Sequence, residues 1–163
     1  MRKVLTLLLI FCFWLGYSCS IQAQHISQGN EFEALMQKIR QDFAQNPDIT
    51  QGLEKYNVQD GSFTDVDYAS IQRTNWPPLV HINRISDFVF AYTNPENRYY
   101  QDEDLYNKIE KGLEYWHERN PWCHNWWYNQ IAEPQALGVL LIQMRTGKKQ
   151  LPHELENKLL ERI

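Results

Sequence analysis

The sequence predicts an all-α protein made of helical hairpins. In several segments apolar residues recur at steps of three and four, which is the spacing of one face of a helix. Asn46-Pro47, Asn94-Pro95 and Asn120-Pro121 separate these segments, and the residue before a proline avoids helical backbone. No segment alternates apolar and polar residues regularly enough to indicate a strand. Helices of this length, joined by short connections, are expected to stack in pairs.

The first expected helix runs from about residue 30 to Asn46. One face of it would carry the apolar side chains, which are Phe32, Leu35, Met36, Ile39 and Phe43. A short helical segment is expected to follow over residues 52–56.

Residues 59–68 have a different character. Asp60-Gly61 marks a turn, and the aromatic residues after it are too irregularly spaced for a strand. Asp65 and Asp67 could suggest a calcium loop, but the later glutamate of an EF-hand is missing. We therefore expect an ordered loop here.

Two longer helices form the first expected hairpin. Pro77 and Pro78 open one of them, since proline is tolerated in a first helical turn, and Asn94-Pro95 ends it. The other helix spans residues 102–119. The apolar faces are Ile82, Ile85, Val89 and Tyr92 in the first helix, and Leu105, Ile109, Leu113 and Trp116 in the second.

A second hairpin is expected from residue 134 onwards. Pro134 would occupy the first position of a helix, and Gly147 is well placed to cap its end. Pro152 would start a last helix. The apolar faces are Leu137, Leu140, Leu141 and Met144 in the first, and Leu155, Leu159 and Ile163 in the second.

The amino terminus has the pattern of an export signal. Arg2-Lys3 precedes an apolar run, Val4 to Leu15, that is too short to span a bilayer stably. We therefore expect a signal peptide over residues 1–23, a mature chain that begins at Gln24, and a secreted or periplasmic protein. The alternative is a lipoprotein anchored at Cys19, although the usual aliphatic residue three positions earlier is missing.

The remaining composition excludes several classes of function. The net charge is −4, and no basic cluster is suited to nucleic acid. Outside the signal the one cysteine is Cys123, which cannot form an internal disulfide and is expected to be packed. Scattered histidines give no metal-ligand spacing, so neither a metal nor another cofactor is expected. His81 and His117 are expected to be structural.

Residues 120–134 concentrate aromatic and amide side chains. Trp122, Trp126 and Trp127 fall within six residues, with His124 and Asn125 between them. Flat aromatic faces suit ring-shaped partners, and amides can bind hydroxyl and carboxylate groups without the cost of a buried charge. This composition predicts a shelf for a polysaccharide chain. It is equally compatible with a tryptophan-rich turn that only pins two helices together.

The same stretch resembles a known family. The segment Asn125-Trp-Trp-Tyr-Asn-Gln-Ile-Ala-Glu-Pro-Gln-Ala-Leu-Gly138 is similar to the Asn-Trp-Trp signature of the chondroitin AC, hyaluronate and xanthan lyases. Other segments agree in the same order, namely Asp60–Tyr68, Thr74–Pro77 with His81, Tyr99-Tyr100 and Tyr115-Trp116. Met144–Lys149 and Leu159–Arg162 resemble the bacterial chondroitin AC lyases in particular. The similarity runs from about Glu31 to the last residue.

This resemblance implies the amino-terminal part of an (α/α) toroid, expected to be incomplete, over residues 24–163. It implies that Trp126 and Trp127 guide an acidic polysaccharide of the glycosaminoglycan type, with Asn125 beside them. His124 is a further candidate for contact with the sugar.

The family cleaves its substrates by β-elimination, in which a base removes a uronate C5 proton and an acid protonates the leaving oxygen. The family's residues for these steps lie outside the matched segments, so no catalytic residue is assigned. Tyr128 and Gln130 replace the family's usual histidine and glutamate, which is expected to alter contacts around the tryptophans. We expect the amino-terminal fragment of a secreted glycosaminoglycan lyase that does not cleave its substrate alone. The alternatives are a stand-alone carbohydrate-binding module and a non-functional remnant.

Overall fold

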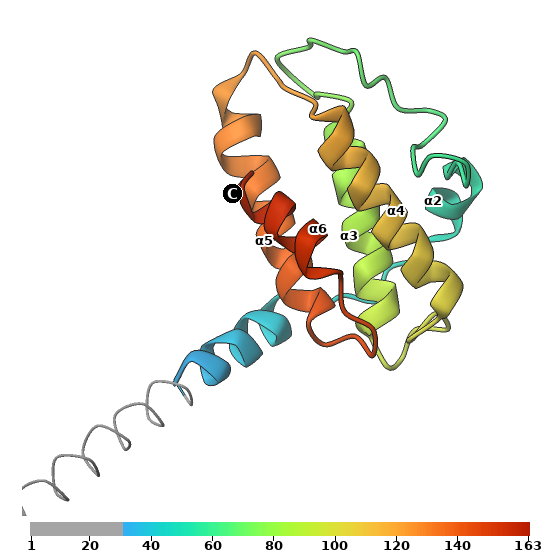
Figure 1. The fold of residues 1–163 in the computed structure, drawn as a ribbon, viewed down its shortest axis with the longest axis vertical. Helices are drawn as coiled ribbons and strands as arrows, with labels where there is room; N and C mark the ends of the chain where they lie inside the picture. Colours follow the sequence, from blue (N-terminus) through green and yellow to red (C-terminus); the bar gives the residue numbers. More distant parts are fainter. Residues whose placement is uncertain (1–30) are drawn as a thin grey trace, which may run out of the picture. The chain divides into compact units, whose positions relative to one another are not determined.

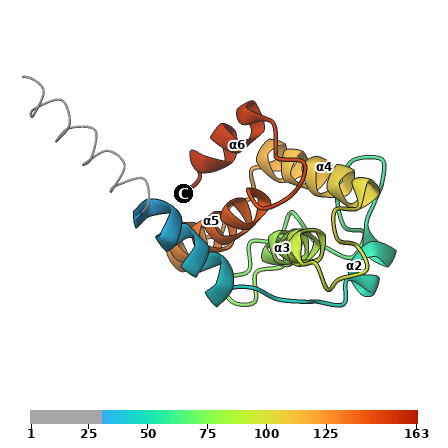
Figure 2. The same ribbon diagram turned by 90° about the horizontal axis from the view of Figure 1, so that it is seen from below.

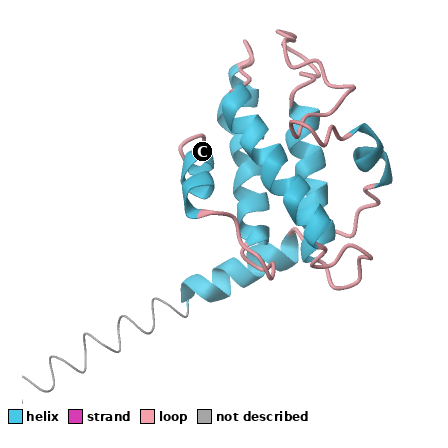
Figure 3. Ribbon diagram, turned by 45° about the vertical axis from the view of Figure 1, so that its right-hand side comes forward, coloured by secondary structure: helices cyan, strands magenta, loops and turns pink. Residues whose placement is uncertain are grey.

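The structure, a computed structural model, describes residues 31–163. Within this range the protein consists of helices and loops without a strand, which confirms the all-α prediction (Figure 3). No helix in the same range is both long and apolar enough to cross a membrane. The predicted signal peptide, residues 1–23 with Cys19, lies outside the described residues.

The chain divides into two compact units between Ile39 and Arg40. The described part of the first unit is helical, and this helix extends over residues 31–42. It confirms the first predicted helix but ends before Asn46. Residues 44–49 have no regular secondary structure, and the backbone restriction before Pro47 disfavours a helix there.

The second unit, residues 40–163, holds the remaining helices. In chain order they are α2 (Thr50–Lys55), α3 (Leu79–Thr93), α4 (Glu103–Arg119), η1 (Tyr128–Ala132), α5 (Glu133–Met144) and α6 (His153–Leu160). The long helices α3, α4 and α5 run in alternating directions, and α3 packs against both of the others (Figure 1). Helix α6 contacts α4 and α5 (Figure 2).

The predicted helix faces form the core of this unit. All of the following apolar side chains are buried: Ile82, Ile85, Val89, Tyr92, Leu105, Ile109, Leu113, Trp116, Leu137, Leu140, Leu141, Met144, Leu155 and Leu159. Gly112 allows α4 to approach α3 closely, because a Cβ atom there would lie 2.4 Å from Ile85 Cδ1. Ile163 is exposed, since α6 ends at Leu160 and the predicted apolar face stops at Leu159.

Local signals place the ends of α4. Asp102 caps its start, with a carboxylate oxygen that accepts a hydrogen bond from the backbone N–H of Leu105 at 2.7 Å. Asn120 caps its end in the left-handed conformation, with φ of 45°, and Pro121 follows. These contacts confirm the predicted limits of the helix.

The loop after α2 is ordered, as predicted. One isolated antiparallel bridge joins Tyr56 and Phe63, and the Asp60 carboxylate accepts hydrogen bonds from the backbone and hydroxyl of Ser62. Asp65 forms a bidentate ion pair with Arg84, at 2.6 and 2.8 Å. Both carboxylate oxygens of Asp65 are therefore bound to Arg84, although a calcium loop would need them as ligands.

Pro134 lies in the first turn of α5, within one residue of the predicted start, but helical backbone begins earlier in the chain. The helix starts at Trp126, and its second turn is the π-helical segment η1, in which the Glu133 N–H donates to the Tyr128 carbonyl. Proline lacks an N–H and clashes with the carbonyl four residues earlier in a regular α-helix. A wider turn directly before Pro134 lets the helix pass through this proline.

The predicted cap at Gly147 is wrong. Helix α5 ends at Met144 with Arg145 as its cap, and Gly147 does not adopt a left-handed conformation. The glycine instead makes room for a ring, because a Cβ atom there would lie 2.4 Å from Tyr92 Cε1.

Candidate functional site

The most exposed aromatic surface in the second unit lies where α4 gives way to the next helix. Residues 121–125 form a loop, and Trp126 and Trp127 occupy the first turn of the helix that follows. Trp122 and Trp126 are each 61% exposed, and Trp127 is 44% exposed. Tryptophan is normally well buried, so three exposed indoles in six residues mark a contact surface. We call Trp122, His124, Trp126 and Trp127 the tryptophan surface.

Asn125 holds the start of this helix. Its Oδ1 accepts a hydrogen bond from the Trp127 N–H at 3.1 Å, and its Nδ2 donates to the Arg73 carbonyl at 2.9 Å. The first bond is that of an N-cap, and the second ties the helix start to the loop before α3. The amide therefore positions the two tryptophans and keeps one N–H and one lone pair for a ligand.

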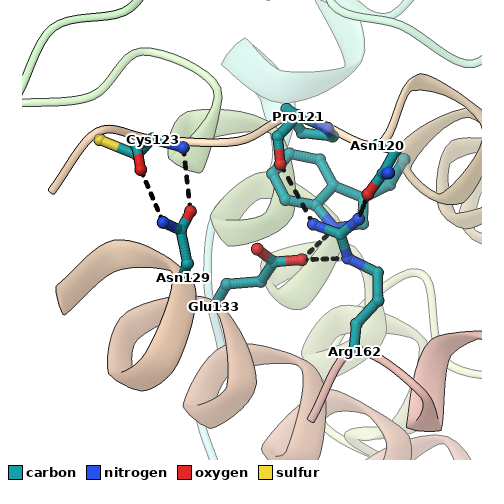
Figure 4. A network of polar contacts seen from close by, with 7 residues as sticks. Asn120, Pro121, Cys123, Asn129, Glu133 and Arg162 are labelled. Carbon is teal, nitrogen blue, oxygen red and sulfur yellow. Dashed lines mark hydrogen bonds and ion pairs between the residues drawn. The ribbon is translucent and has the colours of Figure 1, made fainter. Parts of the chain in front are cut away.

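A second amide holds the loop in front of the helix. Asn129 accepts a hydrogen bond from the Cys123 N–H at 2.9 Å and donates to the Cys123 carbonyl at 2.6 Å (Figure 4). The thiol of Cys123 is fully buried and donates to the Gln72 carbonyl at 3.3 Å. This confirms that Cys123 is a packed residue.

A half-buried ring, Tyr128, and a buried ring, Trp76, pack behind Trp127. Tyr128 lies edge-on to Trp127 with ring centroids 5.2 Å apart, and 5.7 Å from the ring of Trp76. Trp76 is buried and donates from Nε1 to the Ser70 carbonyl at 3.1 Å. Tyr128, which belongs to the same stretch, thus packs against Trp76, while Trp127 remains 44% exposed.

Glu133 anchors the same region to the last turn of the chain. Its carboxylate is 2% exposed and accepts hydrogen bonds from Trp116 Nε1 at 3.0 Å and Arg162 Nε at 2.5 Å. Arg162 also donates to Asn120 Oδ1 and to the Pro121 carbonyl (Figure 4). This network was not predictable from the sequence, because no local pattern connects residues so far apart.

The histidines differ in their surroundings. His124 is exposed on the tryptophan surface and lies edge-on to Trp122, with ring centroids 4.9 Å apart. His81 is fully buried, accepts a hydrogen bond from the Tyr68 hydroxyl and donates to the Gly112 carbonyl at 2.9 Å. Burial lowers the pKa of His81 to about 4, so it is neutral and structural, as predicted. His117 lies in the last turn of α4.

Two hollows lie near these residues. One, of about 330 Å³, runs between α3 and α5, with Trp127 in its wall beside Asn83 and Gln135. Burial raises the pKa of Asp87 in the same hollow. A larger hollow of about 660 Å³ lies between α4 and α6. Its wall holds four glutamates, Glu114, Glu118, Glu154 and Glu161, against two cations, Lys158 and Arg162, which are both in ion pairs. Its acidic lining does not suit an acidic partner, so the tryptophan surface is the better candidate site.

No group of three or more His, Cys, Asp or Glu residues within residues 31–163 is arranged to hold a metal ion.

Comparison with known proteins shows the family of the chain. Residues 21–163 match the family described as polysaccharide lyase family 8, N terminal alpha-helical domain. The chain belongs to this family. It is 43% identical over 104 residues to the chondroitinase-AC of Pedobacter heparinus, an alignment that covers 64% of this chain and 15% of that enzyme.

The fold also matches a solved structure of a family member. That structure belongs to work on the active site of chondroitinase AC lyase in enzyme–oligosaccharide complexes. The two folds superpose with a TM-score of 0.76 at 36% identity, over 80% of this chain and 20% of the other. The chain therefore spans about a fifth or less of the length of these relatives, and the shared part is the amino-terminal α-helical domain.

Proposed function

We propose that this family 8 lyase domain binds an acidic polysaccharide of the glycosaminoglycan type, such as chondroitin or hyaluronan, through Trp126 and Trp127. The observation that carries the proposal is the exposure of both indoles at the start of a capped helix. In this proposal the domain forms the first part of an (α/α) toroid and presents the sugar chain to the rest of a β-eliminating lyase.

The chemistry of the surface fits a sugar chain. Indole faces can stack on the apolar C–H faces of sugar rings, and such contacts need no charge on the protein. Asn125 retains hydrogen-bonding capacity, and His124 lies on the same loop. Binding would therefore depend on shape and hydrogen bonds more than on attraction between opposite charges.

The described residues support binding better than catalysis. Elimination needs an accessible base and an acid close to the sugar. The hydroxyls of Tyr56 and Tyr106 donate to backbone carbonyls, and His81 is buried. We assign the elimination step to groups outside residues 31–163. A carbohydrate-binding role without lysis uses the same surface and is the second candidate function.

Export is also part of the proposal. Arg2-Lys3 and the apolar run that follows support a signal peptide and a secreted or periplasmic location. Sequencing of the amino terminus of the mature protein should find Gln24 or a neighbouring residue. Intact Met1 on protein from the cytoplasm would contradict export, and a lipid on Cys19 would show the alternative route.

Binding is tested by replacing Trp126 with alanine. Affinity for a chondroitin sulfate hexasaccharide, measured by titration calorimetry, should fall by about tenfold, because one aromatic contact is lost. Tyr100→Ala removes an exposed aromatic ring from the turn between α3 and α4 and should leave binding unchanged. Circular dichroism should show unchanged helicity in both variants. If helicity collapses together with binding in Trp126→Ala, the indole belongs to the core and the proposal fails.

A further inference from the structure

Trp122 is exposed although the backbone around it is held on both sides. The Pro121 carbonyl accepts a hydrogen bond from Arg162 Nη2 at 3.2 Å. Both backbone groups of Cys123 are bonded to Asn129. These hydrogen bonds hold the loop on both sides of the indole, which remains 61% exposed. An ordered loop that presents a large apolar ring to solvent is preorganised for contact with a ligand.

The neighbouring ring on the loop orients this indole. His124 lies edge-on to Trp122 with an interplanar angle of 79°, a geometry that favours the contact between the two rings. The pair leaves most of the indole accessible. Trp122 and His124 are the loop-borne half of the tryptophan surface, and Trp126 and Trp127 are its helix-borne half.

We propose that Trp122 is a second sugar platform for the same polysaccharide, and that Asn129 is the residue that positions it beside Trp126. This inference rests on the proposed function. A polymer can contact both halves of the surface at once, so the relative placement of the halves sets its affinity. Asn129 lies in η1, on the helix that carries Trp126 and Trp127. Its side chain forms two hydrogen bonds to the backbone of Cys123, in the loop that carries Trp122.

The Asn129 contact needs an amide. A single side chain must accept from the Cys123 N–H and donate to the Cys123 carbonyl. Ionised aspartate has two acceptor oxygens and no donor, so Asn129→Asp would set a carboxylate oxygen against the carbonyl. Protonated aspartic acid has one donor and an acceptor and can replace the amide.

The platform is tested with Trp122→Ala beside Trp126→Ala and Tyr100→Ala. With a chondroitin sulfate hexasaccharide as the probe, Trp122→Ala should lower affinity by about tenfold, as Trp126→Ala does, and Tyr100→Ala should not. Normal binding by Trp122→Ala with weak binding by Trp126→Ala overturns this inference and leaves the proposed function intact. Normal binding by both variants, or no binding by the unmodified protein, overturns both.

Asn129 is tested with Asn129→Asp at two pH values. At pH 7 this variant should bind the hexasaccharide about five- to tenfold more weakly than the unmodified protein. At about pH 4, where much of the new carboxyl group is protonated, the ratio should return towards one. The near-ultraviolet circular dichroism of the tryptophans should recover in parallel. A purely steric role for residue 129 would give no recovery.

Two controls isolate the contact from general charge effects. Gln130→Glu adds the same charge at the next, exposed position without touching Cys123, and should bind more strongly than Asn129→Asp at pH 7. The neighbouring charged and polar groups are common to all the proteins, so their effects cancel in the affinity ratio. They are His124, Tyr128, the Glu133–Arg162 pair and the side chain of Arg73. Equal losses in the two variants, or a loss that persists at about pH 4, would overturn the role of Asn129.

Discussion

Glu133 and Arg162, 29 residues apart, form an ion pair in which Arg162 Nε lies 2.5 Å from Glu133 Oε1. The same oxygen accepts a hydrogen bond from Trp116, and the same guanidinium reaches the cap of α4 at Asn120. One buried carboxylate thus joins α4, α5 and the turn after α6. The tryptophan surface is built on this junction, since its loop leaves α4 at Pro121.

We expect Arg162→Met to lower the free energy of unfolding by about 3 kcal/mol, because Glu133 would remain buried without its countercharge. Adding Glu133→Gln should restore much of the loss, since glutamine can still accept from Trp116 Nε1. Urea denaturation measures both changes.

The matched control for this pair lies on the surface. Lys158 pairs with Glu154 at 2.7 Å on the outside of α6, where Lys158→Met should leave the free energy of unfolding almost unchanged. Equal losses of unfolding free energy in Arg162→Met and Lys158→Met would show that the burial of Glu133 does not make its ion pair more important for stability.

His81 should make the stability of the fold depend on pH. Burial holds the pKa of His81 at about 4 in the folded state, against about 6.5 in the unfolded chain. The unfolded state therefore binds more protons between these values. The stabilisation is complete above pH 6.5, is lost as the pH falls towards 4, and amounts to roughly 3 kcal/mol.

Urea denaturation between pH 7 and pH 4 measures this dependence. His81→Gln should be less stable at pH 7 but should lose less stability over the same interval. Asp60 and Asp65, whose pKa values are lowered, contribute at the acid end of the range, while the raised pKa of Asp87 acts in the opposite direction. An unchanged pH dependence in His81→Gln would assign the effect to these carboxylates.

Most of the fold follows from local patterns in the sequence. The spacing of Leu105, Ile109 and Leu113 determines which face of α4 is buried, and Asp102 and Pro121 mark its limits. Such signals act within a few residues and need no knowledge of the neighbouring helices. The limits of α3 and the burial of Cys123 were predictable in the same way.

The details of the site were not predictable, because distant residues decide them. Pro134 is a reliable local signal for a helix start, but the π-helical turn carries the helix through it. The Asn129 contact depends on how the chain returns after the loop, and the Glu133–Arg162 pair depends on the packing of α6. Trp126 and Trp127 could be selected from the sequence, whereas their exposure and the role of Asn125 as a cap required the structure.

We expect the purified chain not to cleave chondroitin sulfate or hyaluronan at a measurable rate. Elimination requires a base within hydrogen-bonding reach of the C5 proton and an acid for the leaving oxygen. Burial raises the pKa of the Tyr56, Tyr68 and Tyr106 hydroxyls, which already bond to other groups of the protein. His81 is inaccessible, and His124 has an indole as its ring partner. A catalytic base and acid act as a unit, and losing one costs about as much as losing both. The described residues should therefore give no partial lyase activity. The assay is direct, because elimination creates an unsaturated uronate whose near-ultraviolet absorbance can be recorded over time. Steady formation of that product by the purified chain would contradict the expectation. If His124→Ala abolished the product with helicity unchanged, the tryptophan surface would be a catalytic site.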